Sequence, residues 1–177
     1  MTDLPVSEAA FEEERWESSI TLSEALIGNG ASRLLSSFSG VLVAVTLLGR
    51  NFMHIHRYRK DDSPEDPEKE EFWLRHREID RTISATFSYL PEHLKLPQAL
   101  RDQDVVLFHM CLHVSTICLH QASVVATLEH RLEASYKTQS MDRCVAAADE
   151  ITNVMKMISH FDASNVGLSG HNISDQG

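Results

Sequence analysis

The chain has 177 residues, 42% of them hydrophobic, with seven glycines and five prolines, which favours one folded domain and excludes a collagen-like or low-complexity chain. Three cysteines cannot form a disulfide framework, so we expect a reduced intracellular protein. The net charge of −10 repels phosphate backbones and argues against nucleic-acid binding by this chain alone.

The negative charge lies in two segments. Residues 1–17 contain six acids and one base, and residues 61–71 contain seven acids and one base. The first residues also lack the basic start and apolar run of a signal peptide, so we expect no targeting signal there.

Residues 1–30 are expected to hold a short helix around Leu22, Leu26 and Ile27 that ends at the turn signal of residues 28–30. From Ser32 onward, apolar residues recur at steps of four and three, which is the period of a helix. They are Leu34, Phe38, Val41, Val45, Leu48, Phe52 and Ile55. The spacing predicts a long helix that ends near residues 57–60, where the helix dipole favours cations.

A second long helix is predicted to begin with Asp66 as its cap and Pro67 at its first position, and to end at Pro91. Residues 91–97 are predicted to form a connector in which Leu94 and Leu96 are buried against the helices.

The third helix is predicted to begin near Asp102 or Asp104. No Asp, Glu, Lys or Arg occurs among the 24 residues 105–128, a length that could span a bilayer. Its histidines are unfavourable in hydrocarbon, and its flanks carry no one-sided excess of Lys or Arg. We therefore predict a central buried helix and no membrane partner.

A fourth helix is predicted from a Ser140 cap to Phe161, followed by a disordered tail over 162–177. No segment alternates as a strand does. The prediction is an all-α fold of four long helices and a short N-terminal one.

His109, His113 and His120 fall within about 40° of one another around the third helix. His109 and His113, four residues apart, are the candidates for a shared metal ion, whereas His120 lies too far along the axis to join them. The residue after His109 is Met110, so the metalloprotease motif fails. The favoured interpretation is a hydrogen-bonded polar seam, with no metal site and no cofactor.

Cys111, Cys118 and Cys144 are interpreted as core thiols. No phosphate-binding loop, nucleophile elbow or paired-carboxylate motif is present, so the chain is predicted not to be an enzyme.

The basic residues form two groups. The group of Arg50, Arg57, Arg59 and Lys60 is interpreted as a helix end neutralised by the acidic loop after it, in preference to a nucleic-acid site. The smaller group, Arg75, Arg77 and Arg81, is interpreted as solvated beside Glu78 and Asp80.

Several short segments occur together as they do in one known family. These segments are residues 4–11 (LPVSEAAF), 49–56 (GRNFMHIH), 61–66 (DDSPED), 71–80 (EFWLRHREID), 90–97 (LPEHLKLP), 117–122 (ICLHQA) and 143–151 (RCVAAADEI). Over residues 4–161 the chain resembles the middle regulatory region of fungal binuclear-zinc-cluster transcription factors, also called the xylanolytic-activator-type regulatory domain.

The resemblance implies a non-catalytic, all-α regulatory region that acts in the nucleus. It implies an N-terminal segment over 1–30 and a helical regulatory domain over 31–161. The six-cysteine zinc cluster of the family is absent, so zinc and DNA contact would belong to a separate module, and we expect the chain to be a fragment. The alternative is a small helical ligand- or metal-binding protein that uses the His109/His113 stripe.

Protein partners or self-association are expected because the third helix is apolar almost all round and three other helices would not enclose it. Leu112, Ile117, Leu119 and Val125 are predicted to include residues of this uncovered surface.

Overall fold

A computed structural model of the chain describes residues 2–27, 35–58 and 71–169, with side chains as far as Phe161. It confirms the all-α prediction. The helices are α1 (Glu8–Glu12), α2 (Leu22–Ile27), α3 (Ser37–His56), α4 (Glu71–Ser88), α5 (Gln103–Glu129) and α6 (Ala134–Ser169), with a 3₁₀ turn η2 (Glu92–Leu94). Within the described residues the only β-pairing is an isolated bridge between Asp3 and Thr21.

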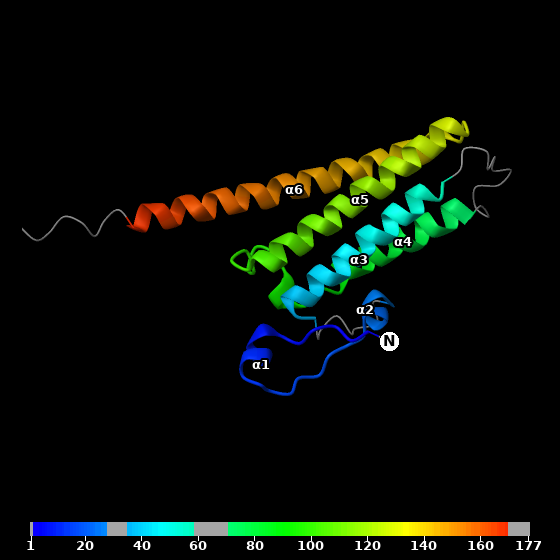
Figure 1. The fold of residues 1–177 in the computed structure, drawn as a ribbon. Helices are drawn as coiled ribbons and strands as arrows, with labels where there is room; N and C mark the ends of the chain where they lie inside the picture. Colours follow the sequence, from blue (N-terminus) through cyan, green and yellow to red (C-terminus); the bar gives the residue numbers. More distant parts are fainter. Residues whose placement is uncertain (1, 28–34, 59–70, 170–177) are drawn as a thin grey trace, which may run out of the picture.

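The four long helices run side by side, and the short helices α1 and α2 lie on one side of them, with α2 against α3 and α4 (Figure 1). Helix α5 is the centre of the arrangement, because it has extensive contacts with both α3 and α6 and also contacts α4. Helices α3 and α4 contact each other over a shorter length than α3 and α5 do.

Side-chain caps fix where two of these helices begin. The hydroxyl of Ser36 accepts a hydrogen bond from the Ser39 amide at 3.2 Å, and α3 begins at the next residue rather than at Ser32. The Asp102 carboxylate accepts bonds from the amides of Asp104 and Val105, which confirms one of the two predicted starts of the third helix. The predicted cap of the second helix, Asp66 with Pro67, lies outside the described residues.

The core lies between α5 and the helices on either side of it. Val105, Phe108, Leu112 and Leu119 of α5 are completely buried, as is Leu94 of the connector. They join one cluster with buried residues of α3 and α4: Val41, Val43, Ala44, Leu47, Ile79 and Ile83. This packing supplies most of the apolar burial that holds the bundle together.

The predicted start of the fourth helix is wrong. Helix α6 begins at Ala134, and Ser140 lies within it, buried, with its hydroxyl oxygen 2.9 Å from that of Ser123 on α5. A serine before an apolar run is typical of a cap, but this one joins two helices instead. Trp73 of α4 packs on Tyr136, with ring centroids 5.6 Å apart, and this contact supports the added N-terminal turns.

The predicted disordered tail also differs from the structure. Helix α6 continues to Ser169, so residues 162–169 are helical, and residues 170–177 lie outside the described part. Extending an existing helix adds a backbone hydrogen bond for each residue fixed, and this does not require an apolar face.

The prediction of which α5 residues form an uncovered apolar surface was partly wrong. Leu112 and Leu119 are 0% exposed because they face the core, and Ile117 is half-buried, whereas Val125 is 50% exposed. The exposed apolar side chains of α5 are Leu107, Val114, Val125 and Leu128. Because α5 carries no charged residues over most of its length, its sequence has no polar face that would indicate which side of the helix points to solvent.

By length and composition, α3 and α5 could each cross a membrane. Core helices of soluble proteins pass the same test, and both helices here pack within the bundle. The finding is therefore weak evidence for a membrane span.

Replacing Leu112 by Ala should lower the free energy of unfolding by about 3 kcal/mol, because a fully buried leucine would leave a cavity. Leu128→Ala is the matched control on the same helix, since Leu128 is 57% exposed, and it should cost less than about 1 kcal/mol. Urea unfolding followed by circular dichroism measures both. Equal losses would contradict the observed orientation of α5.

Candidate functional site

A polar cluster joins α4, α5 and α6. Arg143 of α6 donates to the carboxylate of Asp80 at 2.7 Å and to the hydroxyl of Ser84 at 3.1 Å, both on α4. His120 of α5 places its Nε2 atom 3.3 Å from the same Asp80 oxygen. The same nitrogen lies 3.4 Å from Nε of Arg143, which can only donate, so His120 Nε2 either donates to Asp80 or accepts from Arg143, depending on the tautomer of the ring.

These neighbours stabilise the charged form of Asp80. Burial alone would raise the pKa of its carboxyl, but the hydrogen bonds from His120 and Arg143, together with their charges, lower that pKa to about 2. Asp80 is therefore a carboxylate at neutral pH and has no proton to give as an acid.

A row of aromatic ring contacts connects this cluster to the C-terminal end of α3. His120 meets His76 edge-on at 5.1 Å between ring centroids, and His76 lies 6.1 Å from His54. His54 stacks on Phe72 at 4.5 Å. The row therefore runs from α5 across α4 to α3.

The two inner histidines of this row are neutral. Burial, followed by the charge of Arg75, lowers the pKa of His54 to about 4. Burial, followed by repulsion from His120 and His54, lowers that of His76 to about 3. Neither ring nitrogen of His54 has a hydrogen-bond partner among the described residues, and the Nδ1 atom of His76 also has none.

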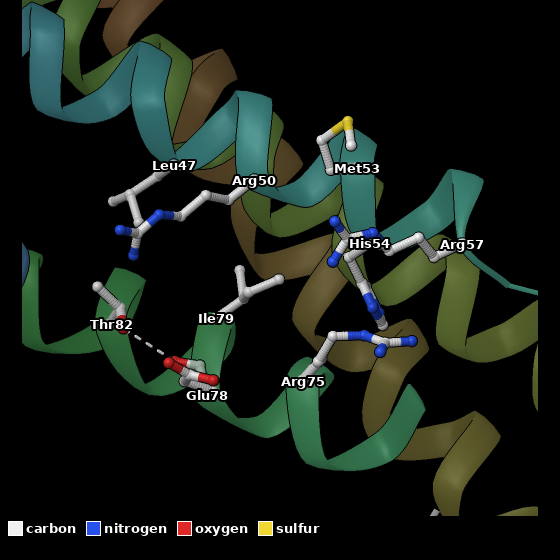
Figure 2. A pocket seen from close by; sticks show the side chains of 9 residues that line it. All are labelled: Leu47, Arg50, Met53, His54, Arg57, Arg75, Glu78, Ile79 and Thr82. Carbon is white, nitrogen blue, oxygen red and sulfur yellow. Dashed lines mark hydrogen bonds between the residues drawn. The ribbon is translucent and has the colours of Figure 1, made fainter. Parts of the chain in front are cut away.

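A pocket of about 430 Å³ opens between α3 and α4 beside His54. Figure 2 shows the side chains that line it: Leu47, Arg50, Met53, His54, Arg57, Arg75, Glu78, Ile79 and Thr82. The volume is in the range of small-molecule sites.

The pocket is rich in cations. Its lining carries three arginines and one glutamate, and His54 is neutral. Arg75 pairs with Glu71, one turn before it on α4. Neither Arg50 nor Arg57 forms an ion pair with any residue that the structure describes.

The sequence did not predict this pocket. It placed Arg50 and Arg57 in one basic group and Arg75 in another, whereas the packing of α3 on α4 brings all three to one cavity. Arg59 and Lys60 lie outside the described residues, and Arg77 and Arg81 do not line the pocket. The sequence shows two of these cations at the end of one amphipathic helix and the third on another, and nothing in that pattern indicates that they meet.

His109 and His113, the candidate metal ligands, each have their own contacts and do not face a shared site. His109 is buried, and its Nε2 atom lies 2.8 Å from the Leu94 carbonyl oxygen, to which it donates. His113 packs against Phe87, with centroids 4.8 Å apart, and the two histidine rings lie 6.5 Å apart. In the described part of the chain no three His, Cys, Asp or Glu side chains are grouped to hold a metal ion. His109, His120 and Ser123 instead make hydrogen bonds of the predicted polar seam.

The three cysteines are half-buried rather than fully buried. Burial raises the pKa of the Cys111 thiol, and burial followed by the nearby Cys118 raises that of Cys144. Thiols held in the protonated form are poor nucleophiles.

Two curated proteins are similar to this chain. The pigment biosynthesis transcriptional activator pigB of Monascus ruber is 26% identical over 168 residues, which cover 91% of this chain and 29% of that protein. The azaphilone cluster-specific transcription factor azaR of Aspergillus niger is 32% identical over 107 residues, covering 60% of this chain and 22% of that protein. The chain thus spans less than a third of the length of either relative.

No protein-family model matches the chain. No solved structure matches it either. The two relatives indicate a region of a fungal transcription factor.

The chain should lose stability as the pH falls from 7 to 5. Unfolded histidine takes up a proton near pH 6.5, whereas folded His54 and His76 resist protonation until about pH 4 and 3, so protons favour the unfolded state in this window. The charged or titratable groups around His76 are His120, His54, Asp80 and Arg77. Each of the two histidines should contribute roughly 1.4 kcal/mol per pH unit below 6.5.

Urea unfolding at a series of pH values tests this expectation. The double variant His54→Leu/His76→Leu should show a flatter pH dependence than the unmodified chain. His56→Leu is the control on α3, because His56 is exposed. An unchanged slope in the double variant would show that these two rings do not carry the acid sensitivity.

Zinc is expected to bind only weakly, because the Leu94 carbonyl already occupies the Nε2 position of His109. His109→Ala and His113→Ala should change stability without changing metal content. Elemental analysis after chelator-free purification measures this. Stoichiometric zinc that is lost in His109→Ala would favour the metal-binding alternative.

Proposed function

We propose that this chain is a non-catalytic regulatory region of a fungal transcription factor that acts in the nucleus. The observation that carries the proposal is the similarity to pigB, which extends over 91% of the chain. The resemblance of residues 4–161 to the middle regulatory region of zinc-cluster factors agrees with it. In this role, DNA contact belongs to a separate zinc-cluster module.

The physical properties of the chain support a regulatory role over a DNA-contacting one. Its net charge is −10, and DNA-binding domains carry basic surfaces. Arg50, Arg57 and Arg75 gather in a concave pocket rather than along an exposed ridge that could follow a groove of DNA.

An interaction with other proteins completes the proposal. Helices α5 and α6 leave apolar side chains partly exposed to solvent: Leu107, Val114, Val125, Leu128, Met141, Val145 and Met155. Apolar surface of this kind suits contact with a protein partner or with further helices.

A reporter assay tests the proposed role. The full 177-residue chain fused to a heterologous DNA-binding domain in a fungal host should change reporter output several-fold relative to that domain alone. Leu119→Asp, which places a charge in the core, should abolish the change, and Leu128→Asp at the surface should keep it. Output equal to that of the DNA-binding domain alone would contradict a regulatory function.

A further inference from the structure

We propose that the pocket between α3 and α4 binds a small organic dianion, a molecule with two carboxylate groups on an apolar body. Three features carry this assignment: the distribution of the arginines, the unpartnered polar atoms and the apolar floor of the pocket.

The arginines supply positive charge at two places. Arg50 and Arg57 are seven residues apart on α3, which separates their backbones by about 10 Å along the helix axis. Figure 2 shows the Arg50 side chain extended toward Thr82, while Arg57 and Arg75 lie at the His54 end. A ligand with an anionic group at each end matches this separation, and planar guanidinium groups bind carboxylates in a bidentate manner.

The His54 end holds polar atoms that lack partners. His54 is only 2% exposed, and none of the residues that the structure describes is hydrogen-bonded to either of its ring nitrogens. The Nε atom of Arg75 is also buried, with no hydrogen-bond partner in the described part of the chain. Buried polar groups without partners cost stability, so a carboxylate that accepts from both side chains would remove this cost.

The remainder of the pocket is apolar. Leu47 and Ile79 are buried and Met53 is half exposed, and together they form its hydrophobic lining. This lining favours an organic body over an inorganic ion. Glu78 is the one acidic residue among the described residues that line the pocket, and it should weaken anion binding.

Isothermal titration of the full chain at low ionic strength tests the site, with isophthalate, adipate and citrate as probes. The uncharged diamide of isophthalate has the same shape and is the matched ligand control. We expect at least one dicarboxylate or tricarboxylate to bind at least tenfold more tightly than the diamide and than inorganic phosphate. Amide NMR shifts should be confined to α3 and α4.

Four variants locate the binding. Arg50→Gln and Arg75→Gln should each weaken it about tenfold, and Glu78→Gln should strengthen it several-fold. Arg81→Gln is the matched control, because Arg81 lies exposed on α4 outside the pocket, and it should change affinity less than twofold. Circular dichroism of each variant verifies folding.

The proposal is overturned if none of the three probes binds, if the diamide or phosphate binds as tightly, or if Arg81→Gln weakens binding as much as Arg50→Gln. The site does not depend on the proposed transcriptional role, although a bound dianion would act as an effector if both hold. The titration uses the isolated chain and the reporter assay uses no added ligand. A negative titration would therefore contradict only the anion site, and a negative reporter assay would contradict only the regulatory role.

Discussion

The absence of charge along α5 is the constraint on which the bundle depends. A helix of 27 residues with no Asp, Glu, Lys or Arg from 105 to 128 is stable in water only when neighbours cover most of it. Helices α3 and α6 flank it, and α4 and the connector close part of the remaining surface. The apolar side chains still exposed on α5, such as Leu107 and Val125, mark the side that these elements leave open.

Polar side chains determine how the neighbours align with α5. The amide of Asn51 on α3 donates to the Ser115 carbonyl at 2.7 Å, and the Ser123 hydroxyl pairs with Ser140 on α6. His109 reaches the connector and His120 reaches α4. Apolar packing alone tolerates sliding of one helix past another, whereas a buried hydrogen bond is satisfied in one register. Each partner of α5 therefore has at least one polar contact that favours a single register.

Local signals in the sequence predicted the fold well, and tertiary signals did not. The period of apolar residues and the Asp102 cap depend on near neighbours in the chain, so they are legible in the sequence. Ser140 looks the same in the sequence whether it caps a helix or contacts Ser123, and only packing distinguishes the two. The seam histidines were predicted as a stripe, but their partners, such as the Leu94 carbonyl and Asp80, lie on other elements. The pocket was missed for the same reason.

The pocket and the polar cluster are connected through contacts. His54 lines the pocket and neighbours His76, which touches His120, and Asp80 joins His120 to Arg143 of α6. Contact along this row is not coupling by itself, because coupling requires an element with two arrangements. Helix α6 packs mainly on α5 and reaches α4 through Arg143 and through the contact of Tyr136 with Trp73. The row therefore links the pocket by contact to the junction of α4 and α6, and α6 exposes the apolar side chains of Met141, Val145 and Met155.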